Sequence, residues 1–296
     1  REGGQANVES KRGCPCGCVY CADPISKGRK QRLREPAAVI TETRNLLKQG
    51  CDCFHFCDCE FNVPKDHAEQ LCHAIVSEGL QERISWYCYA IPLGMDQELI
   101  SLMKRAGCRG INFGVDHGVN SMLERLGRDF RQADIRRVIQ CCKQEGVTAM
   151  LDLLLGSPGE TAETVKEALR FVRNLEPDCV GVSAGVRLYA GTPLVNRLQQ
   201  DGLLENNPNI LGAASNNPGL LRPVFYLEQG IRESLGSIME DILGDDPRYF
   251  IGSNEPVDAN YNYNDNALLV QAIQEGARGA YWDILRQIRT GSGSNL

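Results

Sequence analysis

Short apolar runs alternate along most of the chain with amphipathic segments of helical period. Strands are expected wherever a short apolar run is bounded by turn residues. They fall at residues 7–11, 51–58, 85–90, 110–115, 147–155 and 179–188. Helices are expected where apolar residues recur three or four positions apart. They fall at residues 36–49, 65–77, 97–106, 135–144, 161–175 and 193–200.

This order of strands and helices predicts an α/β fold with a parallel sheet and right-handed crossovers. Six strands, rather than the eight of a complete barrel, indicate an open, partial TIM-like (β/α)6 barrel in residues 1–200. Functional residues are then expected in the loops that follow the strands. Residues 201–296 are expected to form a mainly helical C-terminal accessory region. It would have a loop at 206–218 and helices at 232–243 and 267–289.

Composition narrows the class of protein only slightly. The chain has 296 residues, 42% hydrophobic and 24% charged, as globular chains do. A net charge of −6 disfavours nonspecific binding to nucleic acid, and no apolar run is long enough to span a membrane. The 14 cysteines would indicate disulfides in an oxidising compartment, but the C-x-x-x-C-x-x-C spacing described below and the alternation of helices and strands favour a cytoplasmic protein. The chain begins with Arg1, and a domain that precedes it is one of the arrangements we expect.

Three cysteines near the start of the chain, Cys14, Cys18 and Cys21, have the spacing C-x-x-x-C-x-x-C. Thiolates are soft ligands that suit iron–sulfur clusters. Three cysteines would leave one iron of a 4Fe–4S cluster open to a substrate or cofactor. The alternative is a zinc site with four closed ligands, to which Cys16 could contribute. A role for Cys16 as a substitute cluster ligand also stays open.

This loop resembles that of the radical S-adenosylmethionine (SAM) superfamily, in which an aromatic residue precedes the last cysteine, as Tyr20 does here. The resemblance implies that Cys14, Cys18 and Cys21 hold a 4Fe–4S cluster whose open iron binds SAM. An electron from the cluster would cleave SAM to methionine and a 5′-deoxyadenosyl radical, so that the cofactor carries the chemistry.

The resemblance extends to the loops after the second and fourth strands. The superfamily places a motif that binds the SAM amino group after the second strand. Here Asp58 and Glu60 are suitable acceptors, although the usual glycines are missing. Asp116 follows the fourth strand, where the superfamily contacts the ribose. The adjacent His117 is either an acid–base group or an ordinary loop histidine.

Two further motifs follow the fifth and sixth strands. Residues 156–161 read Gly-Ser-Pro-Gly-Glu-Thr, as in the superfamily, which implies that Gly156, Pro158 and Gly159 approach the adenine. Residues 187–194 read Arg-Leu-Tyr-Ala-Gly-Thr-Pro-Leu, similar to a branch with many cobalamin-dependent members. Arg187 would then pair with the SAM carboxylate. A salt bridge from Arg187 to Asp152 or Asp178 is the alternative.

Two sets of residues are candidates for smaller roles. Cys51, Cys53, Cys57 and Cys59 share one face of the second strand with His55. Residues two apart on a strand lie in a row, so packing is favoured over a second metal site. The second set, Tyr87, Tyr89 and Tyr189, would line the barrel mouth, which the Asn/Tyr-rich C-terminal region with Tyr263 would cap.

The sequence therefore predicts a radical SAM enzyme that acts on a small or medium organic molecule. The first expectation is C-methylation with cobalamin, whose domain does not lie in these residues. One alternative is hydrogen abstraction by the 5′-deoxyadenosyl radical, leading to dehydration, epimerisation or rearrangement. Another is a non-enzymatic, cysteine-rich zinc-binding module. The expected partners are a small-molecule substrate and an electron donor such as flavodoxin or ferredoxin, with no membrane and no nucleic acid.

Overall fold

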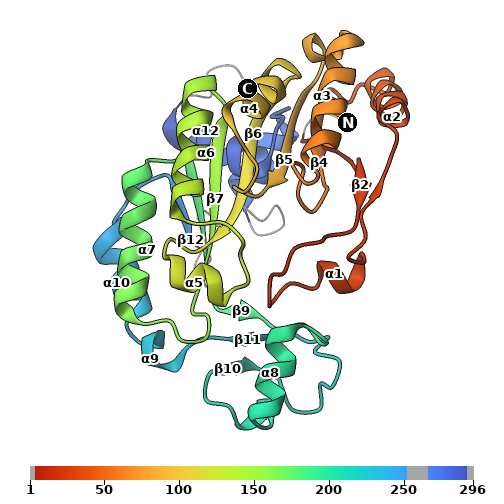
Figure 1. The fold of residues 1–296 in the computed structure, drawn as a ribbon. Coiled ribbons are helices and arrows are strands. Elements are labelled where there is room, and N and C mark those ends of the chain that lie inside the picture. The colour runs from red at the N-terminus through yellow and green to blue at the C-terminus, as the bar shows by residue number, and fades with distance from the viewer. Residues whose placement is uncertain (1–3, 252–265, 292–296) are drawn as a thin grey trace.

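A computed structural model describes residues 4–251 and 266–291 (Figure 1). Its central sheet has seven parallel strands in the order β1-β4-β5-β6-β7-β8-β12. The strands span Ala6–Val8 (β1), Cys53–Phe56 (β4), Ser85–Ala90 (β5), Cys108–Asp116 (β6), Thr148–Leu155 (β7), Cys179–Ala184 (β8) and Tyr249–Ile251 (β12). Most of the central strands are buried on both faces, as is usual for parallel sheets.

One face of the sheet is covered by a row of helices (Figure 1). They span Pro36–Lys48 (α2), Lys65–Ser77 (α3), Gln97–Arg105 (α4), Gln132–Glu145 (α6) and Ala162–Leu175 (α7), and α10 (Leu235–Leu243) packs against α7. Local signals set their ends. The side chain of Asp96 accepts a hydrogen bond from the Leu99 amide at the start of α4, and Gly146 ends α6 in the left-handed conformation. The main hydrophobic core lies between these helices and the sheet.

Two C-terminal helices, α11 (Ala267–Gln274) and α12 (Tyr281–Thr290), pack against the other face of the sheet. Trp282 of α12 lies edge-on to Tyr87 of β5, with 5.8 Å between ring centroids. The Tyr87 hydroxyl donates a 2.7 Å hydrogen bond to Asp283. These helices therefore close the barrel interior near the first residues of the strands, away from the strand ends that carry the predicted motifs.

The chain leaves the main sheet at Gly185, whose φ of 89° requires a residue without a side chain. It then builds a lower lobe from α8 (Pro193–Asp201) and a three-stranded sheet in the order β10-β11-β9 (Figure 1). Its strands span Val186–Arg187 (β9), Ile210–Gly212 (β10) and Val224–Tyr226 (β11). The short elements η2 (Leu204–Asn206) and α9 (Gln229–Arg232) complete it.

The loop that carries the predicted cluster cysteines, residues 13–22, connects two short elements. It runs from β2 (Lys11–Arg12), which pairs with β3 (Arg32–Leu33), to α1 (Asp23–Ser26). Asp58 anchors its base, because this buried carboxylate accepts from the Ser10 amide at 2.7 Å and from the Lys11 amide and ammonium, both at 3.1 Å. The remaining elements are η1 (Leu80–Glu82) and α5 (Asn120–Arg125).

The structure confirms the α/β, partial TIM-like fold with a helical extension, and it corrects four predicted elements. The loop predicted at 206–218 contains the strand β10. The strand predicted at 7–11 is split, and the strand predicted at 179–188 ends at Gly185. The helix predicted at 267–289 is interrupted between α11 and α12, where Gly276 and Gly279 have φ angles of 104° and 140°. The accessory region also supplies β12 to the main sheet. The division of the chain at residue 200 stays a prediction.

Candidate active site at the cluster loop

The cluster loop is held in place by contacts between backbone segments. The Val19 amide donates to the Leu126 carbonyl at 3.1 Å, and the Val19 carbonyl accepts from the Leu194 amide at 2.9 Å. Gly127, with a φ of 75°, lies directly against the carbonyl of Gly17. The loop is therefore clamped between the end of α5 and the start of α8.

Substituting Gly127 by alanine is expected to disturb this clamp, because the added methyl group would overlap the Gly17 carbonyl. A loss of about 2 kcal/mol or more in unfolding free energy is expected, together with poorer iron incorporation. Gly146→Ala is the matched control. Its φ of 62° is similar but it has no neighbour within 4 Å, so only the backbone cost of about 1 kcal/mol applies. Equal effects of both variants in chemical denaturation and iron analysis would contradict the prediction.

A buried network connects the cluster loop to the end of β6. The Arg128 guanidinium, on the loop after α5, lies 2.5 Å from the Asp116 carboxylate and 3.1 Å from the Cys18 sulfur. The Tyr20 hydroxyl donates to Asp116 at 2.7 Å and accepts from Arg128 at 3.1 Å. Burial raises the pKa of the Cys18 thiol to about 12, although the nearby Arg128 opposes this shift. A cation that donates to a sulfur is suited to a thiolate ligand.

Asp116 adopts an unusual backbone conformation at this point. Its φ is 60°, and the register of β6 against β7 shifts between Gly114 and Asp116. Such irregularities re-aim a side chain at the end of a strand. The bulge therefore turns Asp116 toward Tyr20 and Arg128.

The other predicted cluster cysteines lie in the same region. Cys14 is 5% exposed and Cys18 8% exposed, while Cys21 is half-buried and its sulfur accepts from the Asp23 amide at 3.4 Å. Hydrogen bonding to the Cys16 side chain raises the pKa of the Cys14 thiol to about 12. Cys59 contacts Cys14 as well, and its sulfur lies 3.5 Å from the Lys27 ammonium. The donor set and its burial fit an iron–sulfur cluster.

The sulfurs are not preassembled around one point. Within residues 4–251 and 266–291, no three His, Cys, Asp or Glu side chains converge closely enough to hold a metal ion. Because each cysteine of a 4Fe–4S cluster binds a different iron, this finding concerns single metal ions and leaves the cluster assignment unchanged. The cysteines of the second strand are divided: Cys53 packs against α12, Cys57 faces the barrel interior and Cys59 faces the cluster loop.

The two acidic residues predicted after the second strand have different surroundings. Asp58 is fully occupied by Ser10 and Lys11 and has a structural role at the base of the loop. Glu60 lies near Arg128 and Asp116, and burial raises the pKa of its carboxyl to about 8, with Arg128 opposing. Of the two, Glu60 is the one that faces the cluster loop.

His117 and Glu160 form a completely buried pair behind the predicted adenine loop. His117 Nε2 lies 2.8 Å from Glu160, and its Nδ1 accepts from the Val119 amide at 3.0 Å, so the proton is on Nε2. Glu160 also accepts from the amides of Gly156 at 2.5 Å and Ser157 at 3.0 Å. His117 is therefore an ordinary buried histidine that positions residues 156–160, and its burial contradicts a direct acid–base role.

Arg187 has partners other than those predicted for it. Its guanidinium donates to backbone carbonyls of Leu220, Leu221, Arg222 and Val224. It also lies 5.2 Å from the ring centre of Tyr189. Asp178, one predicted partner, instead accepts from the Ala149 amide. Contact between Arg187 and a SAM carboxylate stays a prediction, and these partners give the residue a structural role in the lower lobe.

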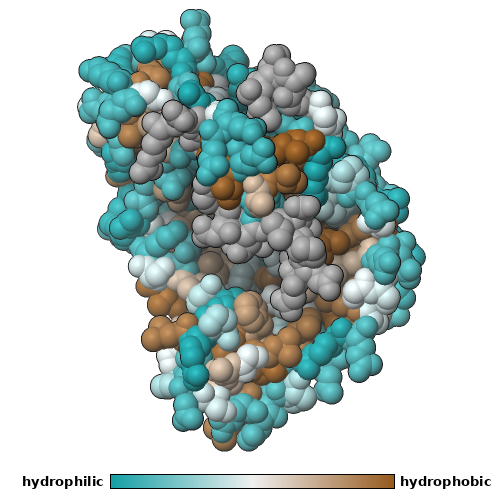
Figure 2. Space-filling view, turned by 180° about the vertical axis from the view of Figure 1, so that it is seen from behind, coloured by the Kyte–Doolittle hydropathy of each residue, from teal (hydrophilic) through white to brown (hydrophobic). Residues whose placement is uncertain are grey.

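A chamber of about 360 Å³ lies inside the barrel, at the inner face of the sheet. Hydrophobic residues border a hollow on the corresponding rear side of the molecule (Figure 2). The chamber is lined from the strands by Gln5, Asn7, His55, Cys57, Tyr89, Asn112 and Asp152, and from the C-terminal helices by Ala280, Tyr281 and Trp282. The polar lining contrasts with the apolar opposite face of the same strands, which is what a ligand cavity requires.

The predicted tyrosines are only partly brought to this chamber. Tyr89 lines it and lies 4.6 Å from the His55 ring. Tyr87 is buried beneath α12, and Tyr189 is in the lower lobe because β9 has left the main sheet. Tyr263 lies outside the described residues.

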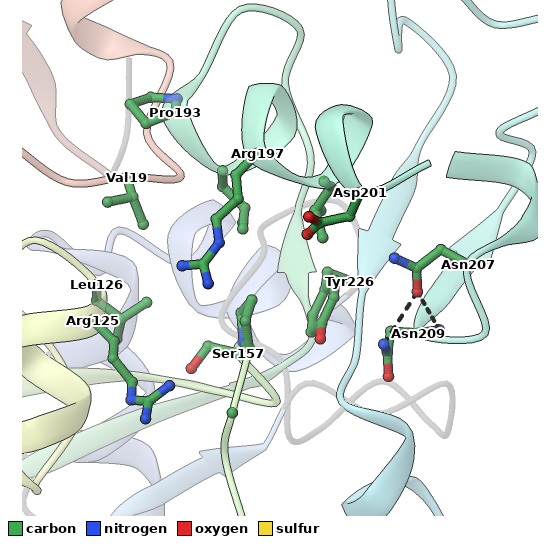
Figure 3. Close-up of a pocket in the computed structure, with 14 residues that line it drawn as sticks. Val19, Arg125, Leu126, Ser157, Pro193, Arg197, Asp201, Asn207, Asn209 and Tyr226 are labelled. Carbon is green, nitrogen blue, oxygen red and sulfur yellow. Dashed lines mark hydrogen bonds between the residues drawn. The ribbon is translucent and has the colours of Figure 1, made fainter. Parts of the chain in front are cut away.

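A second cavity, of about 480 Å³, lies on the lower-lobe side of the cluster loop. Arg125 of α5 and Arg197 of α8 point into it (Figure 3). Pro158 and Gly159 of the predicted adenine loop border it, whereas Gly156 does not. The cavity thus separates the outer part of that loop from the lower lobe.

Comparison with known proteins defines the class. The family model of the radical SAM superfamily matches residues 8–172, more than half of the chain. The chain belongs to the radical SAM superfamily. This confirms the family, the fold and the prediction of an enzyme, and it contradicts the alternative of a non-enzymatic zinc-binding module.

Three individual proteins show which members of the superfamily this chain resembles. The tryptophan 2-C-methyltransferase of Streptomyces laurentii is 28% identical, over 95% of this chain and 56% of its own length. The structure of the methyltransferase TsrM from Kitasatospora setae, with tryptophan and a SAM analogue, is 27% identical with a TM-score of 0.87. It is matched over 99% of this chain and 62% of its own. The enzyme OxsB, 16% identical with a TM-score of 0.64 over 80% of this chain and 40% of its own, shares the fold.

The chain thus spans 56% of that curated relative and 62% of that solved structure. The predicted cofactors are the ones these relatives hold: a second TsrM structure, 25% identical, contains cobalamin and a 4Fe–4S cluster. Among the described residues, no helix combines the length and the apolar character that crossing a bilayer requires.

Proposed function

We propose that this chain is the SAM-binding catalytic part of an enzyme that methylates a carbon atom of a small or medium organic substrate, with cobalamin as a further cofactor. The observation that carries the proposal is that the cluster loop and the polar chamber occupy the same barrel. The buried group formed by Cys18, Arg128 and Asp116 is at the ends of the strands that line the chamber. The likeness to the tryptophan 2-C-methyltransferase over 95% of this chain supports the choice of methylation.

In this proposal Cys14, Cys18 and Cys21 hold the 4Fe–4S cluster. When bound, the cluster would offer its open iron to SAM, and it would supply the electron for SAM cleavage in the alternative reaction by hydrogen abstraction. Arg128 donates to the Cys18 sulfur and orients the Asp116 carboxylate.

The protein would hold SAM between the cluster loop and the ends of β6 and β7. Glu60 and Asp116 are the acceptors there for its amino group and ribose hydroxyls. Gly156, Pro158 and Gly159 would approach the adenine, held in place by the bonds from Glu160 to the loop amides. Asp58 and Arg187 are left out of this set because their polar atoms already have partners.

For net methylation, a methyl group passes from SAM to the substrate carbon, that carbon loses a proton, and S-adenosylhomocysteine remains. The cobalamin would be held by a domain that precedes these residues or lies on another chain. Residues 187–194, which resemble the cobalamin-dependent branch, and the cobalamin in the TsrM structure support this part. A reducing, cytoplasmic setting with flavodoxin or ferredoxin as electron donor belongs to the same proposal.

The test compares Cys18→Ala with Cys16→Ala after anaerobic reconstitution with iron and sulfide. Wild type and Cys16→Ala are expected to bind about four iron atoms and to consume SAM, whereas Cys18→Ala loses both properties. The assay contains dithionite, SAM, hydroxocobalamin and L-tryptophan, and it measures S-adenosylhomocysteine and 5′-deoxyadenosine. S-adenosylhomocysteine supports methylation. 5′-Deoxyadenosine alone would favour hydrogen abstraction, and SAM turnover by Cys18→Ala would contradict the cluster assignment.

A further inference from the structure

The chamber contains hydrogen-bond acceptors that lack donors. Gln5 Oε1 and Asn112 Oδ1 are buried, and neither has a hydrogen-bond partner within the described residues. Asp152 adds a carboxylate to the same lining, and the neighbours that set its pKa are Asn112 and Asp116, neither of which is a cation. Two acceptor atoms without a donor and one carboxylate without a cation therefore line the same cavity.

The strand geometry shows why these groups face the chamber. Gly114 of β6 is paired with Asp152 of β7, and Asn112 is paired with Met150. Side chains two apart on a strand point the same way, so Asn112 and Asp152 share the inner face on adjacent strands. Because the Asn112 amide nitrogen is directed at Asp152, its oxygen is the atom left unpaired.

Leaving such acceptors unpaired costs free energy. A buried polar group without a partner costs about 1–3 kcal/mol, and an unpaired carboxylate costs more. A protein that keeps two unpaired acceptors and a carboxylate without a cation around a cavity recovers this free energy when a ligand supplies donors. These acceptors therefore disfavour ligands that present only acceptors to this part of the chamber, such as a carboxylate or a phosphate.

We propose that the chamber recognises its substrate by a protonated amine, with Asp152 as the counter-ion and Asn112 and Gln5 as further acceptors. The apolar or aromatic body of the substrate then packs against Trp282 and Tyr89. The assignment of this ligand as the substrate rests on the proposed function, whereas the binding of an amine does not.

The charges around Asp152 agree with this role at neutral pH. Burial raises the pKa of Asp152 to about 6, with Asn112 opposing and Asp116 adding to the shift. Burial lowers the pKa of His55, which faces the chamber from β4, to about 4, so this histidine is neutral and does not compete as a cation. From β5, Tyr89 faces Asp152, and burial raises the pKa of its hydroxyl. Asp152 is therefore the ionised group that the chamber presents to a ligand above pH 6.

The experiment measures binding by calorimetry to the reconstituted protein in the presence of SAM. The probes are L-tryptophan, tryptamine and benzylamine. Each is paired with a comparison compound that lacks the amine: indole-3-propionate for the two indole amines and benzyl alcohol for benzylamine. At least one amine is expected to bind at least 10-fold more tightly than its partner, and more tightly at pH 7.5 than at pH 5 as Asp152 ionises. Absence of binding by all three amines, or equal affinity for the amine-free partners, would overturn the proposal.

Asp152→Asn tests the residue, and Asp241→Asn, an exposed position on α10, is the matched control. Asp152→Asn is expected to lower amine affinity at least 10-fold and to remove its pH dependence, while iron content and SAM affinity stay unchanged. Its unfolding midpoint should be equal or higher, because a partly buried carboxylate without a cation is removed. A lower midpoint with unchanged amine affinity would mark Asp152 as structural. Amine binding without SAM turnover would contradict the proposed reaction but not the amine site.

Discussion

Replacing Arg128 by methionine is expected to destabilise the protein by about 3–5 kcal/mol and to make the cluster harder to reduce. The variant leaves the buried Asp116 carboxylate without its cation and removes a donor to the Cys18 sulfur. Hydrogen bonds and positive charge near cluster sulfurs stabilise the reduced state, so their loss shifts the midpoint potential to a more negative value. Urea unfolding of the metal-free protein and a redox titration of the reconstituted protein measure the two effects.

Two controls separate this effect from a general one. Arg105→Met, at an exposed position on α4, should change stability by less than about 0.5 kcal/mol and leave the potential unchanged. Adding Asp116→Asn to Arg128→Met should restore part of the lost stability, because the unpaired charge is then removed as well. A loss below about 1 kcal/mol for Arg128→Met, or an unshifted potential, would mean that the network does not support the cluster loop.

Arg128 shows which part of the site the sequence could not supply. The cysteine spacing is local, so it identifies the cluster loop directly, and the loop after β7 is identified by six consecutive residues. Arg128 instead meets Cys18 across 110 positions of sequence. It stands on a short loop with no periodic pattern, and only the folded clamp between residues 17–19 and 126–127 brings it to the sulfur.

The chamber shows a second limit. Strand alternation correctly placed Cys53, His55 and Cys57 on one face, but it did not say which face was inside the barrel. The sequence predicts Asp152 only as an alternative salt-bridge partner of Arg187, and it predicts no role for Asn112. An isolated polar residue in an apolar strand does not show what it will face until the neighbouring strand is in register. An isolated Asn or Asp within an otherwise apolar buried strand was the available signal.

The fold was predicted more completely than the site because strand and helix patterns are repeated along the chain. The elements that differ from the prediction either follow a glycine or pair with a strand that is distant in the sequence. Gly185 diverts the sixth strand into the lower lobe, and β12, three residues long, forms only because β8 offers it an edge. A three-residue strand carries too little pattern to be found without that edge.

Replacing Glu160 by alanine is expected to cost about 3 kcal/mol or more, since it leaves the Gly156 and Ser157 amides and His117 Nε2 without their acceptor in a buried site. The loop that is proposed to approach the adenine should loosen as a result. The affinity for SAM is therefore expected to fall at least 10-fold, beyond any loss of folded protein. Denaturant unfolding and calorimetric titration with SAM measure the two changes.

Glu163→Ala, an exposed position in the first turn of α7, is the matched control because it removes a carboxylate near the same helix end. It should cost no more than about 1 kcal/mol and leave SAM affinity unchanged. Glu160→Gln retains one acceptor oxygen, so it should fall between Glu160→Ala and wild type in both measurements. If Glu160→Ala matches Glu163→Ala in stability, the buried pair does not hold the loop. If it loses stability but binds SAM normally, residues 156–160 do not contact SAM.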